Sequence, residues 1–214
     1  MQDRERGLLA VLWSALRSPL PPGYGSRPTF GWLLVVLFAV QILTGTLLAM
    51  YYQGSPRMVD ESVRHLMRDV SWGWLMRGIH HWASHGMVLL CLLQLLRFLF
   101  SGAYRGTRAG QWVLGLTMAT LIVGLALGGS LLVWDHTAYW RTTRALETLE
   151  HLPLVGAGLA EILRGGEEVT ATTLSRVWAV HGLLLPWLLA ALLGLNLWYL
   201  GRRRVTGEEQ GERP

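Results

Sequence analysis

Long apolar runs alternate with charged stretches along this chain. Four of the runs, at about 31–52, 79–100, 111–134 and 177–200, each hold twenty or more residues and few charges. About twenty helical residues cross the roughly 30 Å hydrocarbon core of a bilayer. Within lipid the backbone must satisfy its own hydrogen bonds, so such segments form helices. The pattern predicts an all-α membrane protein built as a four-transmembrane-helix bundle.

The stretches between the runs predict amphipathic surface helices in the N-terminus and the outer loops. Residues 3–18 alternate apolar and polar positions at helical spacing. This is typical of a helix on the membrane surface, and an ordinary packed helix stays open as an alternative. Similar stretches occur in the two long connections, at 58–70, 138–150 and 155–164. We expect one domain over 1–214, with a lead-in at 1–30 and a cytoplasmic tail at 201–214.

Composition and charge agree with a membrane location. Hydrophobic residues make up 51% of the chain and charged residues 15%, against roughly 25% charged in soluble domains. The side that holds both termini carries eleven Arg against five acidic residues, and the other side carries eight Arg against nine. The positive-inside rule therefore predicts a multi-pass protein of the bacterial inner membrane with both termini cytoplasmic. No nucleic-acid motif is present, which excludes nucleic acid as a partner.

Polar side chains recur at one spacing on two of the predicted membrane helices. Gln94 follows His80 by fourteen residues, and Asn196 follows His181 by fifteen. At 100° and 1.5 Å per residue, each pair lies within about 60° of one face and roughly 21 Å apart. Because both helices run inward from the outer face, His80 and His181 should share one depth, the histidine level. Gln94 and Asn196 should share a second, the amide level.

The two histidines suggest a cofactor. A histidine on an apolar membrane face is costly unless it has a partner. Two neutral imidazoles at one depth can ligate a haem iron from both sides, which suits electron transfer because no coordination position stays open. Spacing alone leaves haem ligation and a packing role both possible.

Glycines and arginines accompany both levels. Gly31 and Gly45 are fourteen residues apart on the first helix, as are Gly115 and Gly129 on the third. Glycine lets a flat macrocycle approach the backbone, although small residues also serve close helix packing. Arg77 and Arg97 flank the levels, and each could pair with a propionate or anchor its helix at the interface.

These residues resemble the N-terminal, four-helix half of cytochrome b from quinol-oxidising bc-type and bf-type complexes. The resemblance runs from about residue 5 to 200. The fifteen-residue spacing of the fourth helix is similar to that of the bf-type branch. The matching strings are QILTGTLLAMYY at 41–52, RDVSWGWLMRGIH at 68–80, WD at 134–135, LRGG at 163–166 and TLSR at 173–176.

The resemblance implies two b haems, one near each membrane face. His80 and His181 match the ligands of the outer haem, whereas the inner ligands fall on Gln94 and Asn196. Amides are poor ligands for a low-spin haem iron. We therefore expect one haem b at the histidine level, near the outer face. The space at the amide level would be filled by lipid, quinone, side chains or an unusually bound haem. Cys91 does not match the position of the extra covalent haem of the bf-type branch.

The outer quinol site also departs from the family. Val133 stands where the family has proline, and Gln is common at the position of His136. His136 could accept a proton, although a solvated loop histidine is the simpler interpretation. The family's C-terminal half, which contributes much of that site, would be a separate cytochrome b C-terminal-half subunit.

The leading hypothesis is an electron-transfer subunit of a multisubunit bc-like or bf-like oxidoreductase complex, as in a respiratory chain. It would exchange electrons between quinone or quinol and an outer c-type cytochrome or Rieske-type iron–sulfur protein. Two alternatives stay open: a two-haem cytochrome b with unusual inner ligation, and a haem-poor membrane scaffold.

Overall fold

The structure is a computed structural model and describes residues 29–100, 102, 104 and 109–206. The surface helix expected over 3–18 lies outside the described residues, as does the end of the tail. Packing divides the chain into two compact units, Met1–Leu33 and Leu34–Pro214, and of the first unit only the start of α2 is described. The elements in chain order are α2 (Thr29–Ala49), α3 (Val59–Arg68), α4 (Gly73–Phe100), α5 (Ala109–Leu131), α6 (His136–Glu150), α7 (Gly156–Arg164), α8 (Ala171–Ala179), the π-helical turn η2 (Val180–Leu184) and α9 (Leu185–Thr206).

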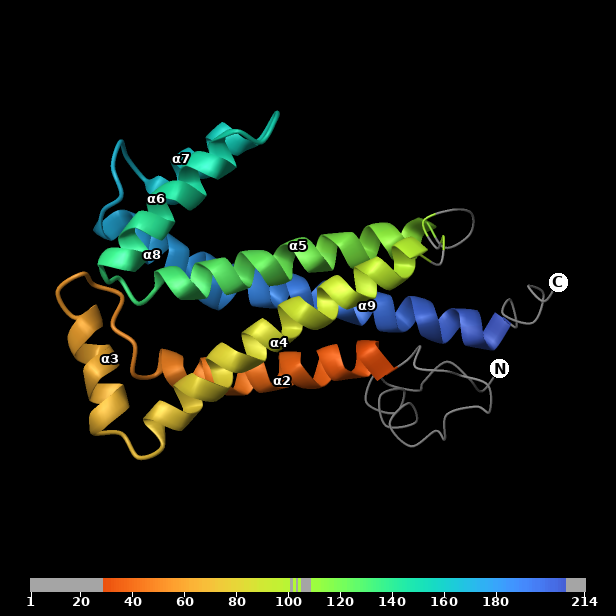
Figure 1. Ribbon diagram of the computed structural model, residues 1–214, viewed down its shortest axis with the longest axis horizontal. Helices are drawn as coiled ribbons and strands as arrows, with labels where there is room; N and C mark the ends of the chain where they lie inside the picture. The colour runs from red at the N-terminus through yellow and green to blue at the C-terminus, as the bar shows by residue number, and fades with distance from the viewer. Residues whose placement is uncertain (1–28, 101, 103, 105–108, 207–214) are drawn as a thin grey trace, which may run out of the picture. The chain divides into compact units, whose positions relative to one another are not determined.

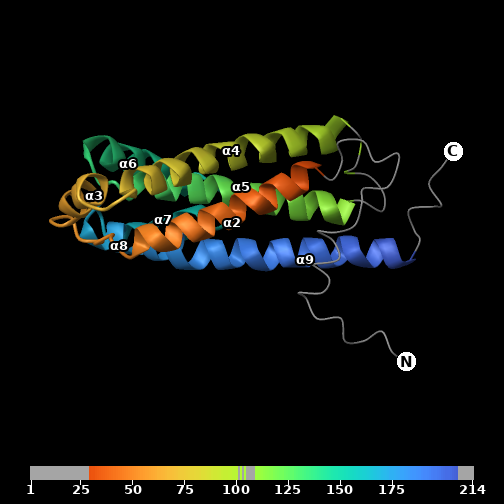
Figure 2. The same ribbon diagram turned by 90° about the horizontal axis from the view of Figure 1, so that it is seen from below.

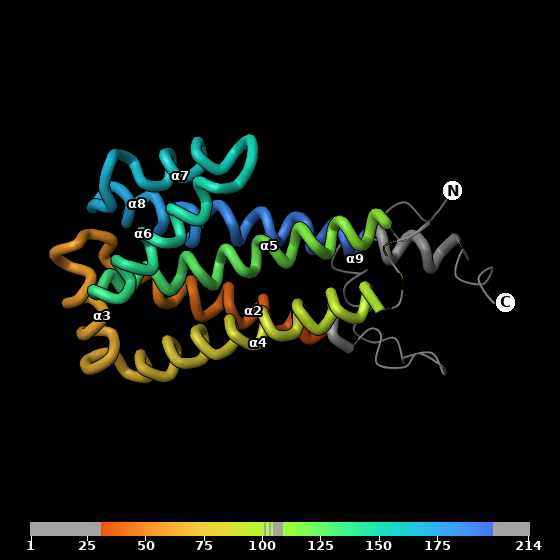
Figure 3. Tube along the Cα trace, turned by 45° about the horizontal axis from the view of Figure 1, so that its top comes forward, coloured from red at the N-terminus to blue at the C-terminus, as the bar shows by residue number. Residues whose placement is uncertain are grey.

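The predicted four-helix membrane bundle is confirmed. Four helical segments are long and apolar enough to cross a bilayer, namely Gly31–Ala49, Gly73–Phe100, Ala109–Leu131 and Ala171–Trp198. Within the second unit, α2, α4, α5 and α9 run alongside one another (Figures 1 and 2), and α5 packs against both α4 and α9. The short helices α3, α6, α7 and α8 gather at one end of the bundle (Figure 3), which we call the loop end.

Two of the membrane helices begin earlier than the hydropathy pattern predicts. The second begins at Gly73 instead of 79, and the fourth begins at Ala171 instead of 177. Thr170 and Thr173 form a capping box that starts α8. A Cβ on Gly73 would lie 2.0 Å from the Leu66 carbonyl oxygen. Only glycine therefore lets α4 start directly against α3. The first turns of α8 carry polar side chains, and those of α4 include Arg77 and two glycines, so the apolar runs do not mark these starts.

The centre of the bundle is filled by apolar side chains. Its buried core comes from three helices, and the side chains of Leu37 and Phe38 on α2 pack against it. Cys91 is one of the core residues, where its buried thiol packs as a small hydrophobic side chain. The core residues are Met87, Cys91, Ala119, Ile122 and Leu189. In sequence they fall between the histidine level and the amide level on α4 and α9.

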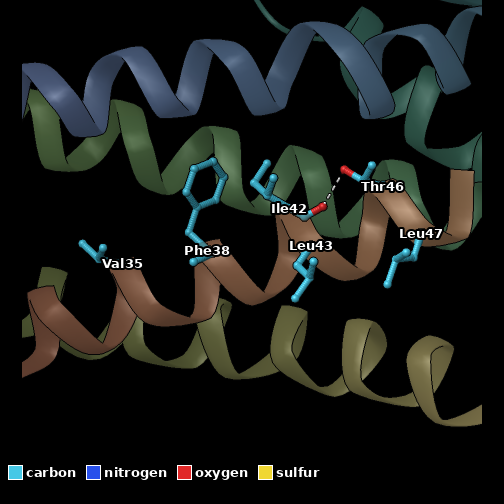
Figure 4. Close-up of a pocket in the computed structure, with 7 residues that line it drawn as sticks. Val35, Phe38, Ile42, Leu43, Thr46 and Leu47 are labelled. Carbon is cyan, nitrogen blue, oxygen red and sulfur yellow. Dashed lines mark hydrogen bonds between the residues drawn. The ribbon is translucent and has the colours of Figure 1, made fainter. Parts of the chain in front are cut away.

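One face of α2 forms an open, almost wholly apolar hollow. Figure 4 shows Val35, Phe38, Ile42, Leu43, Thr46 and Leu47 lining it. The Thr46 side chain lines this hollow, and its hydroxyl donates to the carbonyl oxygen of Ile42 at 2.8 Å. Because this polar group is satisfied within the helix, the face suits contact with acyl chains.

The loop end is tied to the bundle by specific hydrogen bonds. The Tyr52 hydroxyl donates to the Leu132 carbonyl oxygen at 2.9 Å and so joins the chain after α2 to the end of α5. Burial raises the pKa of Tyr52, so the hydroxyl keeps the proton that it donates. Asp135 caps α6 by accepting from the Ala138 backbone N–H at 2.7 Å. These contacts hold the connections close to the end of the bundle where α4 begins.

Candidate functional site

The two histidines predicted to share one depth lie beside each other. The ring centroids of His80 and His181 are 6.5 Å apart, and the ring planes are inclined by 71°. His80 projects from the third turn of α4, and His181 projects from η2. Both side chains are half-buried. The histidine level is therefore a pair of imidazoles from two membrane helices.

The π turn explains the unequal spacing of the two polar pairs. The Leu185 backbone N–H bonds to the carbonyl of Val180, five residues earlier. Pro186 follows and has no N–H to donate, which disfavours a regular α-turn before it. A π turn adds one residue relative to an α-turn. The fifteen residues from His181 to Asn196 thus become equivalent to the fourteen from His80 to Gln94.

Three residues of α2 surround His80. The Gln41 side-chain amide donates to the His80 carbonyl oxygen at 2.6 Å. The Thr44 hydroxyl lies 2.9 Å from His80 Nδ1. A Cβ on Gly45 would come 3.1 Å from His80 Cε1. The helix α2 therefore fixes both the backbone and the ring of His80, and Gly45 lets it approach this closely.

His181 is held by α5 through shape more than through hydrogen bonds. Its Nδ1 is buried and makes no hydrogen bond, although the Leu125 carbonyl is near enough to interact with the ring. A Cβ on Gly129 would lie 2.9 Å from His181 Cε1, and one on Gly128 would lie 3.4 Å from His181 Nδ1. Gly45 and Gly129 were expected to make room for a macrocycle. In the structure they lie against the imidazoles themselves.

The separation of the two histidine rings fits a haem whose iron both rings would hold. Each metal–imidazole bond is about 2.0 Å long, so two rings bound to one ion have centres about 6 Å apart. The observed 6.5 Å agrees with this separation. Among the described residues, no group of three or more His, Cys, Asp or Glu is placed to hold a bare metal ion. A haem brings its own equatorial ligands and needs two from the protein.

The amide level lacks this arrangement. Gln94 is half-buried, and its Oε1 is buried without a hydrogen bond. Asn196 and Arg97 are half-buried as well. A Cβ on Gly115 would contact the Phe98 ring at 3.7 Å, so an aromatic side chain lies beside that glycine. Gly31 belongs to the first compact unit, and its part in this level stays a prediction.

The remaining candidates lie outside the imidazole pair. Arg77 is half-buried, and its Nη1 lies 3.7 Å from Met67 Sδ on α3. His81 and His85 are exposed and in ring contact with each other, on a different face of α4 from His80. His136 is exposed at the start of α6, where its Nε2 accepts from Trp140 Nε1 at 3.2 Å.

Two residues of the site were not predicted from the sequence. Gln41 and Thr44 are polar side chains, three residues apart, in an otherwise apolar stretch of α2. Polar groups within a membrane helix usually face the bundle interior and find a partner. That cost is the signal that could have identified them. Both also lie in the string at 41–52 that carries the family resemblance.

Comparison with known proteins gives the family. A sequence model described as "Cytochrome b/b6/petB" matches residues 18–203. The chain belongs to the cytochrome b family. Cytochrome b6 from Synechococcus sp. strain WH7803 is 34% identical over 188 residues, which cover 88% of this chain and 86% of that protein. Cytochrome b6 from Prochlorococcus marinus strain MIT 9303 has the same identity and coverage.

A solved structure has a similar fold. A chain of a "Hyperthermophilic respiratory Complex III" is 28% identical and superposes with a TM-score of 0.75. The match covers 91% of this cytochrome b family chain and 52% of the solved chain. The protein therefore spans about half the length of that relative.

Proposed function

We propose that this cytochrome b family protein is a membrane electron-transfer subunit that carries one haem b at the histidine level. His80 and His181 would hold its iron. The observation that supports this most is the 6.5 Å separation of the two imidazole centroids between α4 and η2. When bound, a haem held by two imidazoles supplies a one-electron carrier with no open coordination position.

The protein's own residues give this site its character. Gln41 and Thr44 orient His80 from α2. Gly45 and Gly129 keep the space against the two imidazoles free of side chains. Arg77 lies one turn before His80, and we propose it as a partner for a haem propionate. Its thioether contact with Met67 is weak enough to give way.

Without imidazoles, the amide level offers no second stepping point for electrons. Gln94 and Asn196 lie roughly 21 Å from the histidine level along their helices. Apolar side chains such as Met87, Cys91 and Leu189 fill the bundle core. Electron exchange is therefore confined to the side of the membrane that holds the histidine level. We propose that electrons do not follow the family's two-haem path across the membrane in this protein.

The partners follow from that location. Electrons pass between quinone or quinol and a c-type cytochrome or Rieske-type iron–sulfur protein on the outer side. A separate cytochrome b C-terminal-half subunit belongs among the proposed partners. The positive-inside bias puts the loop end outside and both termini in the cytoplasm of a bacterial inner membrane.

Alanine at the amide level tests the single-site proposal. We expect Gln94→Ala combined with Asn196→Ala to keep the haem content and midpoint potential of the wild-type protein, because neither amide binds iron. The measurement is haem absorbance per chain together with a redox titration.

The matched control for this test is His80→Ala, which removes an imidazole at the other level of the same helix. It should lose the haem that the amide variant keeps. If the amide variant loses haem while the protein stays folded, an unusually ligated inner haem is present and the single-site proposal is wrong.

A further inference from the structure

One hydrogen-bond chain on α2 determines which nitrogen of His80 carries a proton. Thr44 is buried, with 6% of its surface exposed, so its hydroxyl is satisfied by protein groups. Its Oγ1 lies 2.7 Å from the Val40 carbonyl oxygen and 2.9 Å from His80 Nδ1. A third contact, to the Gln41 carbonyl, is longer at 3.4 Å. A hydroxyl has one hydrogen to donate and two lone pairs to accept with.

The contact with Val40 decides where that hydrogen goes. Two oxygens approach to 2.7 Å only with a hydrogen between them, and a carbonyl has none to give. The Thr44 hydroxyl therefore donates to Val40, as threonines in helices commonly do to the carbonyl four residues earlier. Toward His80, the Thr44 oxygen can then only accept. His80 Nδ1 must be the protonated nitrogen of its ring.

We propose that Thr44 is a positioning residue that fixes the tautomer of His80 and leaves the Nε2 lone pair free for iron. This rests on the proposed function, in which His80 is an axial ligand. Metal-binding histidines usually donate their second ring N–H to a protein acceptor, which fixes the tautomer and makes the ring a stronger donor to the metal. His181 Nδ1, by contrast, is buried and makes no hydrogen bond. The two imidazoles thus differ in their hydrogen bonding at Nδ1, and α2 orients the His80 ring before the cofactor binds.

The variant Thr44→Val tests this with little change in side-chain volume. Loss of the acceptor should weaken haem binding about tenfold. This is the lower end of the loss in metal affinity that follows when the hydrogen-bond partner of a metal-binding histidine is removed. It should also raise the midpoint potential, because a less electron-donating imidazole stabilises ferric iron less. Thr44→Ser keeps a hydroxyl and should restore both values. Thr46→Val is the matched control, since the Thr46 hydroxyl bonds to Ile42 on the exposed side of the same helix.

A second readout does not need the cofactor. In haem-free protein with ¹⁵N-labelled histidine, the His80 ring should show a protonated Nδ1 in the wild type and a mixture of tautomers in Thr44→Val. Nδ1 protonation that is unchanged in Thr44→Val would overturn the proposal. So would a haem affinity and potential equal to those of Thr46→Val. If His80→Ala instead keeps its haem, the proposed function is wrong. The tautomer measurement in haem-free protein tests the role of Thr44 independently of that result.

Discussion

Replacing His181 with alanine should abolish the low-spin haem spectrum of the purified protein. The change removes one of two imidazoles whose centroids lie 6.5 Å apart, and no other described histidine lies at that site to replace it. A single remaining imidazole leaves iron five-coordinate, which weakens binding and alters the spin state. The measurement is the visible spectrum and the haem content per chain of the protein purified in detergent.

The control for His181→Ala is His85→Ala. His85 is an exposed histidine of α4 that contacts His81 and not the imidazole pair. It should retain the full spectrum. Unchanged absorbance in the folded His181→Ala protein would instead favour the haem-poor scaffold.

Adding one methyl group at Gly129 should disturb the site almost as strongly. A Cβ there would lie 2.9 Å from His181 Cε1 and 3.4 Å from His181 Nε2. Such a contact is closer than packed atoms tolerate, so the imidazole must move away from its place opposite His80. We expect Gly129→Ala to lower haem affinity by about tenfold or more, since misplacing a metal ligand costs at least as much as removing its supporting partner.

Gly124→Ala is the matched control on the same helix. Its Cβ would meet Leu185 Cδ1 at 3.7 Å, an ordinary packing distance. This variant should bind haem like the wild type and unfold at a similar temperature. Equal haem affinity in the two glycine variants would show that close packing against His181 does not govern the site.

The main features of the fold and the imidazole pair could be predicted because they depend on regular spacing. Apolar runs of membrane length specify the four crossings. On α4, Gln94 falls on the face of His80 because fourteen residues make nearly four turns. His181 could be placed at the same depth because both helices run in the same direction from one face of the membrane.

Other features depend on contacts between segments, which spacing does not reveal. The π turn at Val180–Leu184 alters the register of the fourth crossing, and the apolar pattern of that segment does not reveal it. The hydrogen bond between His80 and Thr44 joins residues 36 positions apart. The early start of α4 depends on how closely Gly73 approaches Leu66. In each case the local structure depends on a neighbouring group that the spacing of residues does not identify.

The haem content of the intact protein distinguishes a one-haem subunit from a two-haem cytochrome b. The chain supplies two imidazoles at the histidine level and two amides, Gln94 and Asn196, at the other. A pyridine haemochrome assay on protein quantified by amino-acid analysis gives the number of haems per chain. We expect one haem b per chain, and none in His80→Ala. Two b haems per chain would show that the amide level also holds a haem and that the single-haem proposal is wrong.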